Sequence, residues 1–451
     1  MMTKSISFFC ISTFASSAMA LNLSELQGER RVEYRSPQGL AEVCVIPKKW
    51  PGASYRADDV EKENDLCSYD FHSNMGICPK YTSTNPAILI LKPNASYSKD
   101  AIDASNCDVK KMGVKTEAKF KQSVTCSYTP GILAYYPISR ILGNVGRVPV
   151  AVIRSMDRDI HARLTDKAIA NLQNSPYEIK SSWAAMGRIH KTPGNYPTVV
   201  DNSLSQLYGA LSDNIKNEEQ YMEVSGNGPY ETRYQRFLQQ PPFQKVASSQ
   251  SVEQIVGTKD FASVAQTVTQ MKDVSDLVLL DTLMNQQDRI GNIHYKFYWY
   301  AANPSSMKIE RMKSEAKWVG NQLQVPQAEK DAMAGKQAAL IKEMVLKDND
   351  CAIIKTNMMR RVNALEQVRH ISYSTYRRFL AFERTLKDAY TKDYFTREML
   401  FTSNDYAVLV GNATKAKQIL LSKCQAGELH FDVDLETYIP GASKPAYRCD
   451  L

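Results

Sequence analysis

Eight cysteines follow residue 20, and their spacing restricts the folds that this chain can adopt. Five precede residue 127 and three follow residue 350: Cys44, Cys67, Cys78, Cys107, Cys126, Cys351, Cys424 and Cys449. No two form a Cys-x-x-Cys pair and only six histidines are present, which disfavours a zinc site. The even number predicts disulfides. Either one bridge joins the two groups or each group keeps a free thiol, and Cys424 with Cys449 is the preferred pair.

The first twenty residues, MMTKSISFFCISTFASSAMA, have the organisation of a secretory signal peptide. Lys4 precedes an apolar core, and Ala18 and Ala20 provide the small residues required for cleavage. We therefore expect an exported protein, secreted or periplasmic, in a compartment that permits disulfides. No later segment approaches the roughly 20 apolar residues of a membrane span, so we expect no stable membrane insertion.

The formal charge of +8 is spread along the chain. No basic run is interleaved with aromatic residues, so we expect no nucleic-acid partner. The oligomeric state stays open, because no sequence pattern bears on it.

Apolar patterns alternate between strand-like and helix-like segments. Strands are predicted at 87–91, at 148–153 and in the apolar run before Asp348. Helices are predicted before Gly143 and over most of 158–215, 252–286 and 356–424. This mixture indicates an α+β fold.

Four polar residues stand where predicted elements end: Lys92, Asp288, Asn292 and Asp348. Phosphoryl transfer from a nucleotide needs such groups in this order. A strand lysine neutralises phosphates, a loop carboxylate orients the attacking hydroxyl, and an amide with a second carboxylate holds the metal. The sequence therefore predicts Lys92 as the phosphate lysine, Asp288 as the base, and Asn292 and Asp348 as metal ligands.

Each of these residues also has an ordinary interpretation. Asp288 could be a helix-terminal acid beside a base, and Asn292 could turn the chain after Gly291. Asp348 could belong to a strand-ending turn, and Lys92 could be the solvent end of an edge strand. The ordered set is harder to obtain by chance than any one member.

At these positions the chain resembles the secretory-pathway kinases that include the Golgi casein kinase, the proteoglycan xylose kinase and four-jointed, which are atypical relatives of the protein kinase fold. LDTLMNQQDR, 280–289, is similar to the lead-in to that family's catalytic loop, with Asp281 seven residues before Asp288. AYYPISRILGNVGRVPVAVIR, 134–154, is similar to the family's helix ending in Arg-Ile-Leu and its Val-Pro strand. VLKDNDCAI resembles its Asp-Asn-Gly segment, and AILILKP more loosely resembles its lysine strand.

The resemblance implies a bilobal, kinase-like fold, with a small β-rich N-lobe over 21–155 and a mainly helical C-lobe over 156–451. It implies ATP in the cleft, Mg or Mn as the metal, and transfer of the γ-phosphate to a hydroxyl of a protein or glycan acceptor. By the same resemblance, Asp288 is the catalytic acid/base, Asp348 the metal ligand and Lys92 the phosphate contact.

Several positions depart from the family's pattern. Ile132 stands where the helix glutamate that pairs the lysine is expected, and Glu117 is the nearest substitute. Asn292 lies one residue closer to Asp288 than the usual metal amide, Asp350 is a further possible ligand, and no glycine-rich loop precedes residue 87. Three other hypotheses therefore stay open: a nucleotide-binding pseudokinase or scaffold, a kinase relative that transfers AMP, and a purely structural secreted domain.

Overall fold

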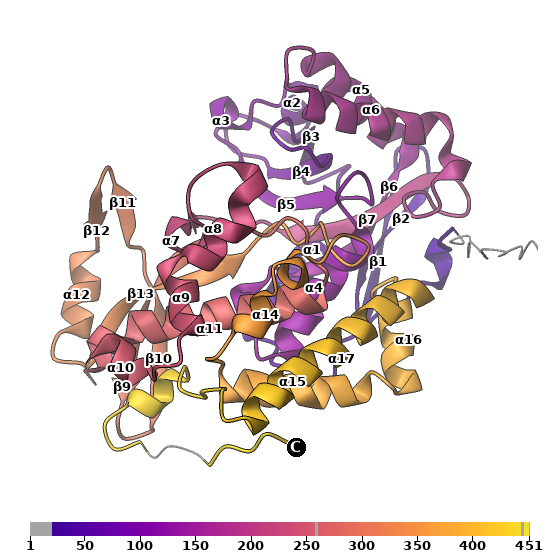
Figure 1. Ribbon diagram of the computed structural model, residues 1–451. Coiled ribbons are helices and arrows are strands. Elements are labelled where there is room, and N and C mark those ends of the chain that lie inside the picture. Colours follow the sequence, from indigo (N-terminus) through magenta and orange to yellow (C-terminus); the bar gives the residue numbers. More distant parts are fainter. Residues whose placement is uncertain (1–19, 258–259, 443–445, 451) are drawn as a thin grey trace, which may run out of the picture.

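The computed structural model describes residues 20–257, 260–442 and 446–450. Residues 1–19 of the predicted signal peptide lie outside the described residues. Within the described ranges the chain forms two parts, a sheet-rich N-terminal part and a mainly helical C-terminal part (Figure 1).

A seven-stranded antiparallel sheet organises the N-terminal part, with strand order β1-β2-β6-β7-β5-β4-β3. Its strands are β1 (Arg30–Arg35), β2 (Ala41–Ile46), β3 (Gly76–Pro79), β4 (Ala87–Lys92), β5 (Lys115–Lys121), β6 (Ala151–Asp157) and β7 (Gln206–Asp213). Its helices are η1 (Leu23–Glu25), α1 (Ala57–Leu66), α2 (Lys99–Ala104), α3 (Val109–Met112), α4 (Thr129–Ile141), η2 (Val145–Arg147), α5 (Arg158–Asn171), α6 (Tyr177–Lys191) and η3 (Pro193–Asn195).

The C-terminal part combines helices with a four-stranded sheet, in which β8, β10 and β13 all pair with β9, and with a separate two-stranded sheet of β11 and β12. Its strands are β8 (Glu219–Gln220), β9 (Ile293–Asn303), β10 (Lys308–Lys313), β11 (Lys317–Val319), β12 (Gln322–Gln324) and β13 (Ala338–Leu346). Its helices are α7 (Met222–Ser225), η4 (Tyr230–Thr232), α8 (Arg233–Gln239), α9 (Pro241–Ala247), α10 (Val252–Val256), α11 (Phe261–Leu283), α12 (Gln327–Met333), α13 (Met358–Arg361), α14 (Ala364–Gln367), α15 (Tyr373–Thr385), α16 (Ala389–Arg397), α17 (Ser403–Gln425) and η5 (Leu435–Tyr438).

Helix α4 connects the two parts. All of its residues are buried, and it ends just before Gly143, whose φ of +99° is left-handed. Near its start Gly131 lies against Ala352, so close that an added Cβ would be 2.9 Å from the alanine side chain. The absence of a side chain at Gly131 thus lets the N-terminal part approach the segment that follows Asp350.

The α+β architecture expected from the sequence, with a β-rich N-terminal part and a mainly helical C-terminal part, is confirmed: a sheet with a buried helix between β5 and β6 in the chain is followed by a helical part with its own small sheet. The predicted strand at 87–91 and the predicted helix before Gly143 correspond to β4 and α4. The strand predicted at 148–153 begins later, at Ala151.

One strand falls in a stretch predicted to be mostly helical. β7 completes the first sheet at Asp213, so the predicted lobe boundary at 155–156 cuts through β6, and α5 and α6 are inserted between two neighbouring strands. In β7 an added Cβ on Gly209 would lie 2.2 Å from the Lys121 carbonyl oxygen. A larger residue there would push β5 away and displace Lys121.

Four disulfides join the eight cysteines: Cys44–Cys67, Cys78–Cys107, Cys126–Cys351 and Cys424–Cys449. The preferred pair of Cys424 with Cys449 is confirmed. Of the two alternatives for the remaining cysteines, the chain adopts the bridge between the groups, which ties the start of α4 to the segment after β13.

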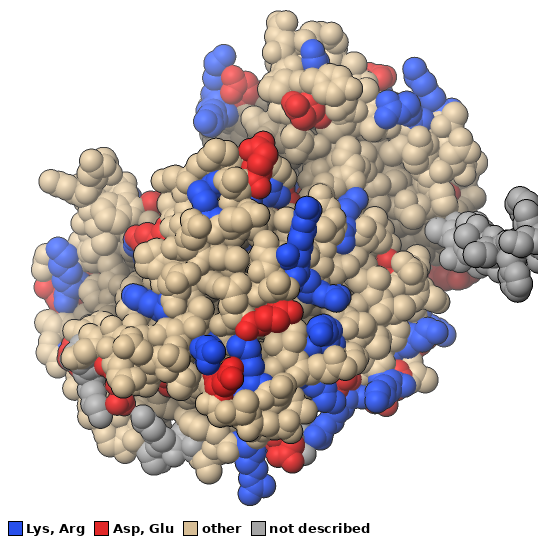
Figure 2. Space-filling view, in the orientation of Figure 1, with Lys and Arg blue, Asp and Glu red and all other residues tan. Residues whose placement is uncertain are grey.

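None of the helices in the described ranges combines the length and the apolar character needed to cross a membrane. Basic and acidic side chains are interspersed over the face drawn in Figure 2.

Replacing Cys126 and Cys351 together by alanine is expected to lower the free energy of unfolding by about 2–5 kcal/mol, because the bridge closes a long loop of the unfolded chain. The matched control, Cys424→Ala with Cys449→Ala, should lower it less. Cys424 and Cys449 are 25 residues apart in the sequence, whereas Cys126 and Cys351 are 225 residues apart. Urea denaturation followed by fluorescence measures both variants, and a larger loss in the control would contradict this account.

Candidate functional site

The loop that follows α11 is held beside the segment that follows β13. The Gln287 amide donates to the Cys351 carbonyl at 2.9 Å, and the Ile353 amide donates to the Met284 carbonyl at 2.7 Å. Asn285, in a left-handed conformation with φ of +50°, ends the helix and donates its side-chain amide to the Ile353 carbonyl at 2.9 Å. Asp288 and Asp348 therefore come from two segments with fixed relative positions.

A buried ion pair anchors both segments. Arg289 Nε donates to Asp281 Oδ2 at 2.8 Å, and neither side chain is exposed. The same guanidinium donates to the Lys347 carbonyl at 2.8 Å and to Asn349 Oδ1 at 2.6 Å. The Tyr135 hydroxyl, from α4, donates to Asp281 Oδ1 at 2.8 Å. Burial disfavours the charge of Arg289, but Asp281 outweighs burial and raises the Arg289 pKa.

Asp288 presents its carboxylate beside this pair. Its side chain is 33% exposed, and Oδ1 accepts from the Arg233 guanidinium at 3.0 Å and from the Tyr230 hydroxyl at 3.4 Å. Burial raises the pKa of Asp288, and the nearby Asp350 carboxylate raises it further, while Arg233 and the Tyr230 hydrogen bond act in the opposite direction. A carboxylate with these properties can accept a proton from a hydroxyl placed against it.

Asn292 belongs to the same loop as Asp288. Its side-chain amide donates to the Asp288 carbonyl at 2.9 Å, so it fixes the loop backbone. Its role as a metal ligand remains a prediction.

Asp348 and Asp350 converge on one ammonium group. Lys121 Nζ, from the end of β5, lies 3.0 Å from Asp348 Oδ1 and 2.9 Å from Asp350 Oδ2. Burial works against the charge of Lys121, but the two carboxylates raise its pKa. Lys121 in turn holds the pKa of Asp348 well below its usual range. Asp348 adopts a φ of +48°, a left-handed conformation that aspartate enters more readily than most residues.

Further lysines surround this cluster. Burial lowers the pKa of Lys119 to about 8 and also lowers that of Lys80, although the Asp348 carboxylate opposes both shifts. A cavity lies beside the cluster, and Lys347 lines it together with Lys121 and Asp348. Lys347 also forms an ion pair with Glu218. Asn85, in the connection between β3 and β4, also reaches this cluster, because its side-chain amide donates to Asp350 Oδ2 at 3.1 Å. Basic side chains on both sides of two carboxylates suit a polyanion that binds together with a cation.

The carboxylates fit a divalent metal. Two carboxylates already share one cation, and carboxylate oxygens are the ligands that Mg²⁺ prefers. Asp348 and Asp350 would hold the ion, with Asn85 beside them. The described residues contain no group of three or more His, Cys, Asp and Glu side chains arranged around a metal position.

The structure does not bring Lys92 to this site. β4 and β5 are antiparallel, with Ala87 opposite Lys121 and Lys92 opposite Lys115. Lys92 is exposed and stands at the other end of the strand pair, about 20 Å along the strand from Lys121 at the usual rise per residue. The physical reason is strand register, and Lys121 occupies the position proposed for Lys92.

Lys121, which contacts both carboxylates, was not among the residues predicted from the sequence. Its signal is the alternation in KTEAKFK, 115–121, a polar face on the strand directly before α4. Ile132 lines the same cavity as Lys121. Glu117 forms an ion pair with Lys216 and not with Lys121.

The chain matches no protein-family model, and no curated protein matches it. Among solved structures it is similar to the crystal structure of the Golgi casein kinase with Mn/ADP bound, at 12% sequence identity and a TM-score of 0.42. The match covers 81% of this chain and 77% of that chain. At this level the similarity assigns no role to any residue of this chain.

Arg289→Ala is expected to lower the free energy of unfolding by about 3–5 kcal/mol, because it leaves the Asp281 carboxylate buried without its cation. Arg289→Lys should recover only part of this loss, since an ammonium lacks the planar fork that binds both Asp281 oxygens while also reaching the Lys347 carbonyl and Asn349. Chemical denaturation measures both. The exposed Lys92→Ala is the control and should change little, and an Arg289→Ala variant as stable as this control would contradict the anchoring role.

Proposed function

We propose that the protein is a metal-dependent kinase that transfers the γ-phosphate of ATP to a hydroxyl of a protein or glycan acceptor in an exported, disulfide-permitting compartment. The observation that carries the proposal is the convergence of Asp348 and Asp350 on Lys121, among further lysines, beside the loop that presents Asp288. Phosphoryl transfer depends mainly on positioning and charge neutralisation, and these residues provide both.

Each residue has a role in this proposal. Lys121 and Lys119 neutralise the phosphate oxygens. Asp348 and Asp350 would hold the divalent metal, which would supply positive charge to the phosphates. Asp288 accepts the proton of the acceptor hydroxyl as that oxygen bonds to phosphorus and the bond from phosphorus to the ADP oxygen breaks. Arg233 and Tyr230 hold the Asp288 carboxylate and border the place of the acceptor.

A specific observation favours a second candidate, a nucleotide-binding pseudokinase. Lys121 has no carboxylate partner on α4, where Ile132 lines the cavity, and its ion pairs go to Asp348 and Asp350 instead. A site in which the lysine keeps these carboxylates would bind nucleotide without arranging it for transfer.

Incubation of the protein with Mn²⁺ or Mg²⁺ and γ-labelled ATP tests the proposal. We expect label on the protein, on an acidic test substrate or in free phosphate. Asp288→Ala and Asp348→Ala should each reduce the rate by at least about a hundredfold, because each removes a group needed in the transition state. Lys121→Ala should have a similar effect and Lys92→Ala none.

The outcomes separate the candidates. ATP-dependent thermal stabilisation that Asp348→Ala abolishes, without turnover, would support the pseudokinase. Label transferred from α-labelled but not γ-labelled ATP would indicate AMP transfer. If neither turnover nor stabilisation is observed, both the kinase and the pseudokinase are excluded.

The pH profile provides a separate test of Asp288. The base must be ionised, so kcat/KM should rise with pH through the pKa of Asp288, and burial places this rise above the range of an ordinary aspartate. Arg233→Gln should move the rise to still higher pH, because the guanidinium favours the charged carboxylate. Arg236→Gln is the matched control, since Arg236 bonds to the Pro229 carbonyl and not to Asp288. An unchanged profile in Arg233→Gln would argue against Asp288 as the base.

A further inference from the structure

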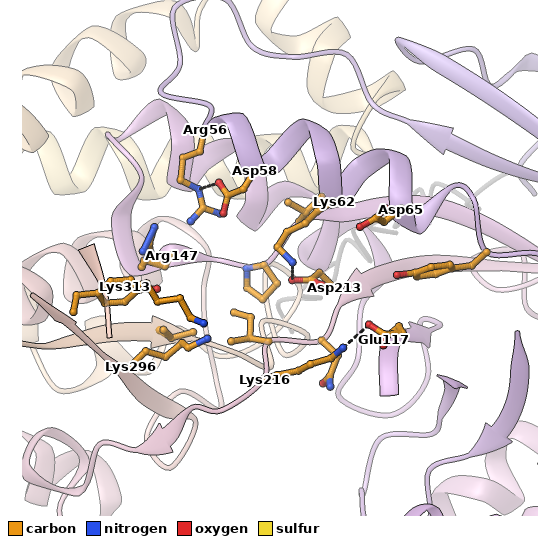
Figure 3. A pocket seen from close by; sticks show the side chains of 17 residues that line it. Arg56, Asp58, Lys62, Asp65, Glu117, Arg147, Asp213, Lys216, Lys296 and Lys313 are labelled. Carbon is orange, nitrogen blue, oxygen red and sulfur yellow. Dashed lines mark hydrogen bonds and ion pairs between the residues drawn. The ribbon is translucent and has the colours of Figure 1, made fainter. Parts of the chain in front are cut away.

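A cavity of about 340 Å³ lies between α1, the segment after β7, and the strands β9 and β10 (Figure 3). We call it the inter-sheet cavity. It shares Pro149 and Asp213 with the cavity around Lys121 and Asp348 but is lined by neither of these two charged residues. Its volume is within the range of small-molecule sites.

Basic side chains outnumber acidic ones in its lining. The basic residues are Arg56, Lys62, Arg147, Lys216, Lys296 and Lys313.

Three of its four acidic residues are already paired with basic lining residues. Asp213 binds Lys62 at 2.9 Å, Asp58 binds Arg56 at 3.3 Å, and Glu117 binds Lys216. These three acidic side chains are therefore already neutralised. The remaining basic lining residues, Arg147, Lys296 and Lys313, have no ion-pair partner among the described residues that line the cavity.

Lys296 on β9 is the main such cation. It is half-buried, and among the described residues it has no ion pair and no hydrogen bond through its ammonium group. Figure 3 shows its ammonium group close to that of Lys313. Burial lowers the pKa of Lys296, and the charges of Lys313 and Arg147 lower it further, while the carboxylates of Glu218 and Glu315 act in the opposite direction. Arg147 is bound to the buried Glu343, and Lys313 to the exposed Glu315; neither glutamate lines the cavity.

We propose that the inter-sheet cavity binds a small molecule carrying two or more phosphate groups, with Lys296 and Lys313 on one wall and Lys216 on another. Phosphate oxygens accept hydrogen bonds from ammonium groups and would supply the partner that Lys296 lacks. Lys313 and Lys216 would contribute beside their carboxylate partners, Glu315 and Glu117. Cations on separate walls call for more than one anionic group. Tyr69 and Tyr298 supply flat walls for the body of the ligand.

This site needs neither the metal carboxylates nor Asp288. The test can therefore be run without metal, nucleotide or acceptor, and its failure is separate from any failure of the proposed kinase activity.

Calorimetric titration of the full, disulfide-intact chain with inorganic pyrophosphate in EDTA tests the proposal. Lys121→Gln serves as the background, so that the lysine cluster of the first site contributes less. We expect pyrophosphate to bind this variant, and to bind Lys121→Gln with Lys296→Gln about tenfold more weakly. Equal affinity in the two variants, or no binding to either, would overturn the proposal.

The melting temperature of Lys296→Gln provides a second test, because a structural role for Lys296 predicts a decrease and the proposed binding role predicts an increase. Without any anion, Lys296→Gln should raise the melting temperature, because it removes a half-buried charge that its neighbours repel. Pyrophosphate should then stabilise this variant less than wild type. Lys313→Gln, at an exposed position that cannot destabilise the core, should also reduce the pyrophosphate effect. A lower melting temperature for Lys296→Gln, or an unchanged pyrophosphate effect in both variants, would contradict the assignment.

Discussion

The buried pair of Arg289 and Asp281 is the interaction on which the rest of the site depends. An isolated charge at this depth would be too costly to keep, so each partner fixes the other. Through its remaining donors the guanidinium also holds the backbone at Lys347 and the side chain of Asn349. The residues next to these anchors, Asp288 and Asp348, are thereby positioned without contacting each other. One desolvated cation thus sets the spacing between a loop and a strand end far apart in the sequence.

Next to this anchor, one buried lysine neutralises two carboxylates while two neighbouring lysines have lowered pKa values. Lys121 satisfies Asp348 and Asp350, while Lys119 and Lys80 lose part of their basicity to burial. On the proposed function, a metal bound by the carboxylates would compete with Lys121, and the released ammonium group would need a phosphate oxygen. Metal and nucleotide should then bind with positive coupling, because each supplies the partner that the other removes.

Local pattern was sufficient for some features and insufficient for others. The end of α4 at Gly143, the loop around Asp288 and the Cys424–Cys449 pair follow from short stretches of sequence. β7 was missed because QLYGALSD is buried almost throughout and shows no alternation. Lys92 was expected near Asp348, but it lies at the other end of the strand pair from Lys121, because position along a sheet depends on register, and register involves the neighbouring strand. A residue's partner across a sheet cannot be read from its own segment.

The connectivity of the disulfides has a consequence for how the protein is made. Each bridge joins cysteines that are consecutive among the eight after residue 20. If thiols become available in the order of synthesis, oxidation in that order yields the native pattern without any reshuffling. The bridge of Cys126 cannot form until Cys351, which is 225 residues further along the chain, has been synthesised. On that order, the bridge between Cys126 and Cys351 would close later than the two that precede it, and it joins the start of α4 to the segment after β13.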